Sequence, residues 1–146
     1  IVIGNHRADI CYGEDIIEFQ HSNISAVEFM ARTKFYIKQG YTVIWVFDLN
    51  DEFEMDRLEM YDDNKWSWKY PSKTFIDFNP KFDYWERNVF LMFQIEDIIY
   101  RVVWCIHKWD DMQGKYINDY SRFCTFDYRF AMTQDEFVDW IKKRNS

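Results

Sequence analysis

The stretch IIEFQHSNISAVEFMARTKFYIKQGYTVIWVFD, residues 16–48, predicts a strand, a helix and a second strand. Ser25 is a favoured N-cap residue, and Glu28, three positions later, completes the sequence pattern of a capping box. Gly40 stands where a glycine commonly ends a helix. Residues 41–47 form an almost unbroken β-branched and aromatic run, which is typical of a strand covered on both faces.

The two strands of this unit are predicted to be parallel. A helix that joins two strands of one sheet usually makes a right-handed crossover between parallel strands. We therefore expect the strand at 41–47 to lie parallel to the strand at 16–20. The fold class that follows for the first half of the chain is α/β.

The second half of the chain gives weaker signals. Residues 51–64 are acidic and only weakly periodic, so they are expected to form a loop or a short helix. Alternation predicts a strand at 65–70, and two apolar runs flanking residues 96–97 predict a strand pair. A last helix is predicted from 134 to about 144, with Thr133 as its N-cap.

Composition limits the class of protein. A chain of 146 residues fits one domain, and its formal charge of −7 argues against a uniformly basic, non-specific nucleic-acid binder. No apolar run approaches the ~20 residues that span a bilayer, and no signal peptide opens the chain, so we expect a cytoplasmic protein that does not bind membranes. The three cysteines lack any CxxC spacing, which favours free thiols.

A hairpin before the first long strand opposes two acidic residues. If its turn is the pair Gly13-Glu14, or the four residues from Tyr12 to Asp15, the antiparallel register pairs residues whose numbers sum to 27. Asp9 then faces Glu18, and Arg7 faces Gln20 on the same side. The other side carries Ala8, Ile10, Ile17 and Phe19, together with His6 opposite His21, for which packing or phosphate contact is the expected role.

Like charges directly opposed on neighbouring strands are destabilising, so something should compensate for Asp9 and Glu18. One carboxyl group is protonated, basic neighbours neutralise the pair, or a cation binds between them. An exposed hairpin whose polar face is only solvated is the alternative. On the following helix, Arg32 and Tyr36 stand one turn apart and project from one side, although Arg32 also has the spacing for an intrahelical pair with Glu28.

The arrangement D-x(8)-E-x-Q on a hairpin, followed by a helix and a buried strand, resembles the core of the PD-(D/E)XK nucleases. More closely, residues 6–10 (HRADI), 17–25 (IEFQHSNIS), Arg32, 35–36 (FY) and 43–48 (VIWVFD) look like the nuclease domain of the competence protein CoiA family. The resemblance covers about the first third of the chain. It implies a restriction-endonuclease-like mixed sheet flanked by helices.

The resemblance also implies a chemistry: metal-dependent hydrolysis of DNA phosphodiester bonds, with Asp9, Glu18 and Gln20 as catalytic residues. Asp9, Glu18 and the main-chain carbonyl of Phe19 would hold a Mg²⁺ or Mn²⁺ ion, a hard cation that prefers oxygen ligands. Gln20 takes the position of the usual lysine. Its amide can orient a water or a phosphate oxygen but cannot supply positive charge or act as a base.

Three further residues are expected to contact phosphate or substrate. Arg32 has the planar fork that binds phosphate well, and Tyr36 and Arg7 are expected beside it. The implied partner is DNA, single-stranded or foreign, in uptake, recombination or defence. A catalytically inactive nucleic-acid-binding module and a protein-interaction domain on the same fold are the alternatives.

The resemblance predicts one domain over residues 1–146, with core motifs at 5–48, an extension with strands at 49–132 and a C-terminal helix at 133–146. The nuclease core normally begins with a helix, whereas residues 1–4 (IVIG) are predicted to form a strand. We therefore expect the first core helix to be missing. A preceding segment or a protein partner would then complete the site.

Overall fold

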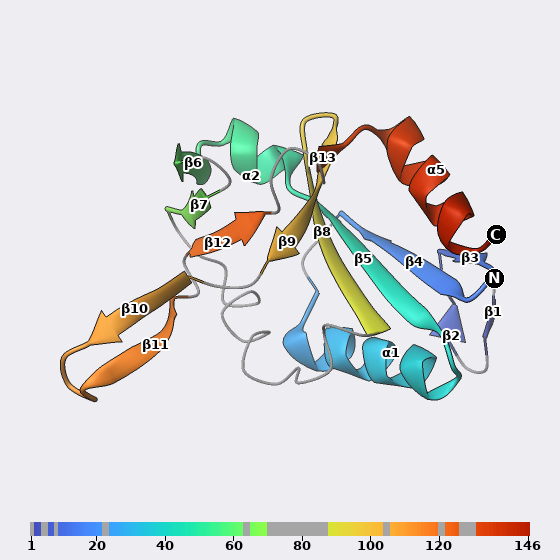
Figure 1. Ribbon diagram of the computed structural model, residues 1–146, viewed down its shortest axis with the longest axis horizontal. Coiled ribbons are helices and arrows are strands. Elements are labelled where there is room, and N and C mark those ends of the chain that lie inside the picture. The colour runs from blue at the N-terminus through green and yellow to red at the C-terminus, as the bar shows by residue number, and fades with distance from the viewer. Residues whose placement is uncertain are drawn as a thin grey trace.

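The computed structural model describes residues 2–3, 6–7, 9–21, 24–62, 65–69, 88–103, 106–119, 122–125 and 131–146 of the chain (Figure 1). In chain order the elements are β1 (Val2–Ile3), β2 (His6–Arg7), β3 (Ile10–Tyr12), β4 (Asp15–Gln20), α1 (Ala26–Lys38), β5 (Thr42–Asp48), α2 (Asn50–Glu54), β6 (Leu58–Asp62), β7 (Lys65–Trp68), β8 (Val89–Ile95), β9 (Ile98–Val103), β10 (Ile106–Asp110), β11 (Lys115–Asp119), β12 (Arg122–Thr125), β13 (Ala131–Met132) and α5 (Gln134–Arg144).

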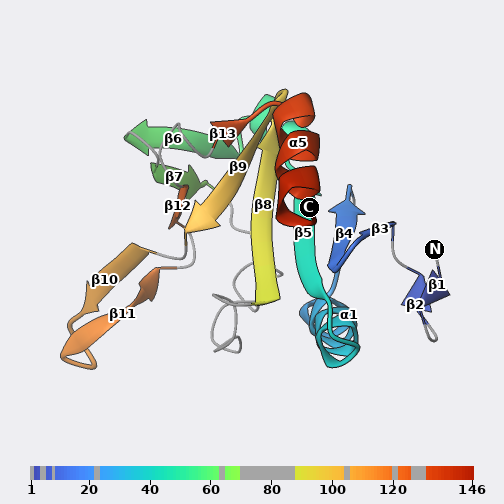
Figure 2. The same ribbon diagram turned by 45° about the vertical axis from the view of Figure 1, so that its right-hand side comes forward.

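One mixed sheet organises the fold. Its strand order is β3-β4-β5-β8-β9-β12-β7-β6, and β13 also pairs with β9. β5 lies parallel to both β4 and β8, whereas β3 is antiparallel to β4 and β9 is antiparallel to β8. The predicted α/β class and the parallel pairing of the first two long strands are therefore confirmed. The pair β10-β11 forms a separate ribbon that extends away from this sheet (Figures 1 and 2).

The central strand β5 shows why the sheet needs helices on both sides. Residues 43–47 are all buried, and side chains alternate between the two faces of a strand. Val43, Trp45 and Phe47 belong to the apolar cluster that includes α1, whereas Ile44 and Val46 pack in the cluster that includes α5. Figure 1 shows these two helices on opposite sides of the parallel strands. The predicted mixed sheet flanked by helices is confirmed.

Helix α1 begins and ends at the predicted residues. The Ser25 hydroxyl accepts a hydrogen bond from the backbone N–H of Glu28 at 3.1 Å. At the other end, Gly40 adopts a φ of 92° and donates to the carbonyl of Ile37 at 2.9 Å, and the next residue donates to the carbonyl of Tyr36 at 3.1 Å. These two bonds form a Schellman motif, which satisfies carbonyl groups at the helix end.

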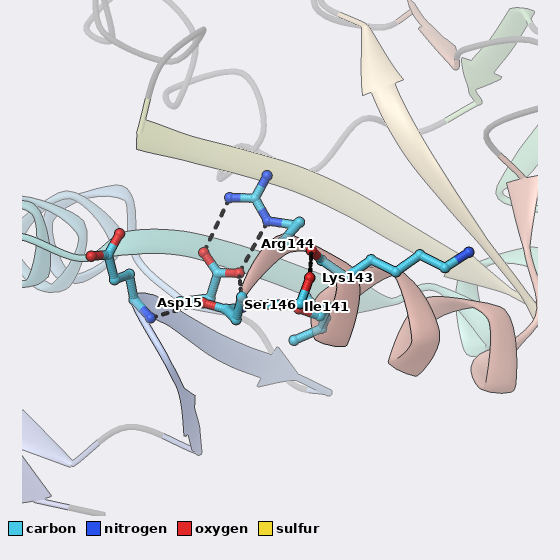
Figure 3. Close-up of polar contacts among 7 residues, drawn as sticks. Asp15, Ile141, Lys143, Arg144 and Ser146 are labelled. Carbon is cyan, nitrogen blue, oxygen red and sulfur yellow. Dashed lines mark hydrogen bonds and ion pairs between the residues drawn. The ribbon is translucent and has the colours of Figure 1, made fainter.

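Helix α5 also matches its prediction, and it shows a contact that the sequence did not predict. A reciprocal capping box joins Thr133 and Glu136 at its start. At its end, Arg144 binds the carboxylate of Asp15 through Nε (3.0 Å) and Nη2 (3.1 Å) (Figure 3). The side chain of Asp15 is almost fully buried, so the two hydrogen bonds compensate a carboxylate removed from water.

Asn145 completes this attachment of α5 to the turn between β3 and β4. Its amide nitrogen donates to Asp15 at 2.9 Å, and its amide oxygen accepts from the backbone N–H of Glu14 at 2.9 Å. A Cβ atom placed on Gly13 would lie 2.2 Å from that same amide oxygen. The C-terminal end of the helix therefore packs directly on the hairpin turn.

Residues 51–64 differ in part from the prediction. The short helix is present as α2, but residues 58–62 form the strand β6 rather than a loop. β6 pairs with β7, and Leu58 is buried in the main apolar cluster. Tertiary pairing therefore outweighs the acidic composition that disfavours a strand. The strand pair flanking residues 96–97 is confirmed, because β8 and β9 pair directly across that turn.

The hairpin is shorter than predicted at its N-terminal end. β2 pairs with β1, with Arg7 opposite Val2, so the expected pairing of Arg7 with Gln20 is wrong. For the same reason His6 does not pair with His21. Residues 6–7 pair with β1 in a separate two-stranded sheet instead of extending the β3-β4 hairpin. The side chain of Arg7 lies outside the described residues, and its phosphate contact stays a prediction.

The helices of the described part of the chain are all too short or too polar to cross a lipid bilayer.

Candidate active site

The register of the β3-β4 hairpin is the predicted one. Ile10 pairs with Ile17 and Cys11 pairs with Ile16, so paired residue numbers sum to 27. Gly13, the first residue of the two-residue turn, has a φ of 58°, which such hairpin turns require at that position. β3 begins at Ile10, so Asp9 directly precedes the paired strand, and in this register Glu18 is the residue that follows the last paired position on β4.

Asp9 is held by the backbone of the opposing strand. Its Oδ2 accepts a hydrogen bond from the N–H of Phe19 at 2.7 Å. The N–H and C=O groups of one residue point to the same side of an extended strand, so the Phe19 carbonyl is directed toward the side where Asp9 lies. The oxygen atoms of Asp9 and Phe19 that are predicted to bind metal therefore lie on one edge of β4.

Glu18 is buried, with only 2% of its surface exposed. The pKa of its carboxyl group is raised to about 7; burial is the largest cause and the charge of Asp9 adds to it, while a hydrogen bond with Tyr36 and the charge of Arg32 oppose it. Among the described residues, no hydrogen bond of standard geometry reaches its buried Oε1. A buried carboxylate oxygen without such a bond costs stability unless the group is neutral or a cation binds to it.

Helix α1 brings two predicted residues to this carboxyl group. Arg32 and Tyr36 lie one turn apart, and both influence the pKa of Glu18. Tyr36 is fully buried, and burial followed by the charge of Glu18 raises the pKa of its hydroxyl group. Arg32 also forms the intrahelical pair with Glu28, at 2.5 Å. The two roles expected for the guanidinium group are therefore compatible.

Gln20 occupies the next position of β4 on the same face as Glu18, because strand side chains alternate. It is half-buried and lies opposite Phe47 of the parallel neighbour. The fold thus brings Asp9, Glu18, Arg32 and Tyr36 together, with Gln20 beside them. The side chain of Arg7 lies outside the described residues, so its part in the site stays a prediction.

This set of donors fits a hard cation. The described residues contain no group of three or more His, Cys, Asp or Glu side chains that could hold a metal ion. Mg²⁺, however, is usually bound by one or two carboxylates with water and substrate phosphate as further ligands. Asp9, Glu18 and the Phe19 carbonyl supply two carboxylates and one neutral oxygen. The buried Oε1 of Glu18 is the observation that favours such an ion.

A comparison with protein families agrees with this geometry. Residues 3–99 match the family described as "Competence protein CoiA, nuclease-like domain". The chain belongs to this CoiA nuclease-like family. The match extends beyond the motifs at 5–48 and covers the sheet from its first strands into β9. Neither the curated proteins nor the solved structures contain a significant match to the chain.

One polar pair at the carboxyl end of β4 was not predicted. Nδ1 of His21 lies 3.1 Å from Oδ2 of Asp48, at the carboxyl ends of β4 and β5. Sequence reasoning set His21 opposite His6 instead. The parallel register, which places Gln20 beside Phe47 and hence the next two residues side by side, is the signal that finds this pair.

Proposed function

We propose that this CoiA-like domain is a Mg²⁺- or Mn²⁺-dependent deoxyribonuclease that hydrolyses DNA phosphodiester bonds. The observation that carries the proposal is the buried carboxyl group of Glu18, whose pKa is raised to about 7 beside the second carboxyl group of Asp9. A fold tolerates such a pair at a cost in stability. A perturbed acidic pair of this kind is typical of functional sites.

Asp9, Glu18 and the Phe19 carbonyl would hold the ion. A divalent ion bound there supplies Lewis acidity that activates water and offsets negative charge on the phosphate. The backbone N–H of Phe19 orients the carboxylate of Asp9. Orientation by a hydrogen bond fixes the direction in which a ligand oxygen is presented.

The remaining residues position the substrate. Gln20 orients the attacking water or a phosphate oxygen through its amide group. Arg32, whose charge already acts on Glu18, donates to a non-bridging phosphate oxygen. Tyr36 favours the ionised form of Glu18 and so supports metal binding. The net charge of −7 means that DNA affinity relies on this local cation set rather than on the whole surface.

The substrate we propose is single-stranded or foreign DNA, in line with the competence protein named in the family description. The second candidate function is a nucleic-acid-binding module without turnover. It is favoured by the neutral Gln20 in place of a basic residue and by the engagement of Arg32 with Glu28. The two functions differ in whether metal and the acidic pair are needed for cleavage.

The test is cleavage of single- and double-stranded DNA with Mg²⁺ or Mn²⁺ by the chain and by Asp9→Asn and Glu18→Gln. Both variants keep side-chain size and remove a negative charge. We expect a loss of about a hundredfold or more, because a metal ion contributes several kcal/mol to transition-state stabilisation. Glu14→Gln is the matched control, since Glu14 is an exposed carboxylate on the same hairpin. Equal cleavage by all four proteins would contradict the proposal.

A further inference from the structure

A buried hydrogen bond between two side chains joins helix α1 to the central strand β5. The indole Nε1–H of Trp45 donates to the hydroxyl oxygen of Thr33 at 2.9 Å, and that hydroxyl group donates in turn to the carbonyl of Phe29 at 2.7 Å. Both bonded side chains are fully buried. Because the proton of the hydroxyl group is directed to the helix backbone, its oxygen is left to accept from the indole. Each partner is therefore held in one orientation.

This hydrogen bond lies beside the candidate active site. In the parallel register of β4 and β5, Trp45 is the partner of Glu18. Paired residues of neighbouring strands lie on the same face of a sheet, with the strands about 5 Å apart. On the helix, Thr33 directly follows Arg32 and precedes Tyr36 by three residues, a spacing that puts Thr33 and Tyr36 side by side. The bond thus connects the strand next to Glu18 with the helix that carries the other two site residues.

Stability alone is a weak reason for this hydrogen bond. A buried pair of polar groups can be replaced by apolar groups of the same shape at little cost. The rings of Phe29 and Phe47 already pack near the indole ring of Trp45, with centroids 4.6 and 5.8 Å away. Apolar packing tolerates small shifts of one element against another, whereas a hydrogen bond weakens steeply when its angle changes. The directional bond therefore favours one place of the helix over the strand.

We propose that the hydrogen bond between Thr33 and Trp45 positions the site by fixing the place of α1 over the sheet. It holds Arg32 and Tyr36 where they reach the carboxyl group of Glu18 and a phosphate bound beside it. This inference rests on the proposed nuclease function. The bonded pair acts through the two helix residues, which already influence Glu18, rather than on the reacting atoms. A displacement of about 1 Å can lower a catalytic rate about a hundredfold, so a partial shift of the helix is measurable.

Two substitutions each keep one half of the threonine side chain. Thr33→Val keeps its shape and leaves the indole N–H without its acceptor, whereas Thr33→Ser keeps the hydroxyl group and loses a methyl group. Both should destabilise the fold to a similar degree, because an unsatisfied buried donor and a small cavity have comparable costs. Melting temperatures check this expectation and show that both variants fold.

Cleavage of single-stranded DNA at saturating Mg²⁺ separates the two variants. We expect kcat to fall about tenfold in Thr33→Val and to stay within about threefold of the parent value in Thr33→Ser. KM for DNA should stay within about threefold in both, because the loss concerns the placement of catalytic groups. Thr42→Val, the same change at the start of β5, is the matched control and should cleave like the parent chain.

A second readout needs no cleavage. The coupling between Tyr36 and Glu18 is measured as the non-additivity of Tyr36→Phe and Glu18→Gln in the free energy of unfolding at one pH. This coupling should fall to about half or less in the Thr33→Val background and persist in the Thr33→Ser background. A core contact with a purely structural role would lower stability without changing the coupling.

The other results overturn the inference. Equal losses of kcat in Thr33→Val and Thr33→Ser would show that packing alone matters, and a loss confined to KM would show an effect on DNA binding. A coupling that is absent from the parent chain, or unchanged in Thr33→Val, would show that the hydroxyl group does not position Tyr36. Cleavage that is absent from the parent chain, or survives Asp9→Asn and Glu18→Gln, would refute the nuclease proposal. The coupling measured in urea still decides the role of Thr33 in that case, so the two failures are distinguishable.

Discussion

The raised pKa of Glu18 leads to a prediction about stability that can be tested without any substrate. Burial raises the pKa of Glu18 from 4.5 to about 7, so folding favours the protonated carboxyl group. Below pH 4.5 this contribution to stability is fully present, and it is lost as the pH rises through 7. The pKa difference of about 2.5 units corresponds to about 3 kcal/mol, at 1.36 kcal/mol per unit. Only 2% of the surface of Glu18 is exposed, in line with burial as the largest cause of the shift.

Glu18→Gln removes the titrating group while keeping its size. The free energy of unfolding, measured by urea titration at about pH 4.5 and about pH 8.5, should fall by about 3 kcal/mol more in the parent chain than in the variant. Saturating Mg²⁺ should restore stability at the higher pH in the parent chain only, since ligands that bind the folded state stabilise it. Glu14→Gln, an exposed carboxylate on the same hairpin, should behave as the parent chain. Parallel pH dependences for the parent chain and Glu18→Gln would refute the reasoning.

Three further substitutions test the neighbouring contacts. Arg144→Ala leaves the buried carboxylate of Asp15 without its main partner and should lower the free energy of unfolding by about 3 kcal/mol in urea, an effect that Asp15→Asn should partly relieve. Gly13→Ala places a Cβ 2.2 Å from Asn145 at a φ of 58° and should cost about 1 to 3 kcal/mol by the same measurement, whereas a change below 0.5 kcal/mol would contradict it. Tyr36→Phe removes a hydroxyl group that lowers the pKa of the buried site glutamate, so the pH midpoint of Mg²⁺ binding, followed by calorimetry, should move upward; an unchanged midpoint would count against it.

The parts of the fold that short-range signals specify were predictable. The turn at Gly13 sets the hairpin register because turn length and strand alternation leave few alternatives. The caps at Ser25 and Gly40 set the limits of α1 for the same reason, since each acts within a few residues. The acidic pair and the helix residues one turn apart follow from these two elements. The candidate site was therefore largely visible in the sequence.

Contacts between distant segments were not predictable in this way. Arg144 and Asp15 are separated by 129 residues, and no local pattern relates them. Residues 6–7 could pair with β1 or with β4, and the alternation of side chains alone does not decide between these strands. His21 meets Asp48 only because β4 and β5 adopt one of several parallel registers. Each of these features requires the three-dimensional arrangement of the sheet.

The C-terminal helix α5 makes a distant contact with a hairpin that local sequence signals specify. Residues 133–146 lie outside the family match at 3–99, yet the end of α5 fixes the hairpin turn through Arg144 and Asn145. Both strands of the β3-β4 hairpin extend from that turn, so the contacts of the helix end stabilise the register that leads to Asp9 and Glu18. The site therefore depends on a local hairpin for its geometry and on a distant helix for the energy that holds the hairpin in place. Loss of the Arg144 contact should accordingly weaken metal binding as well as stability.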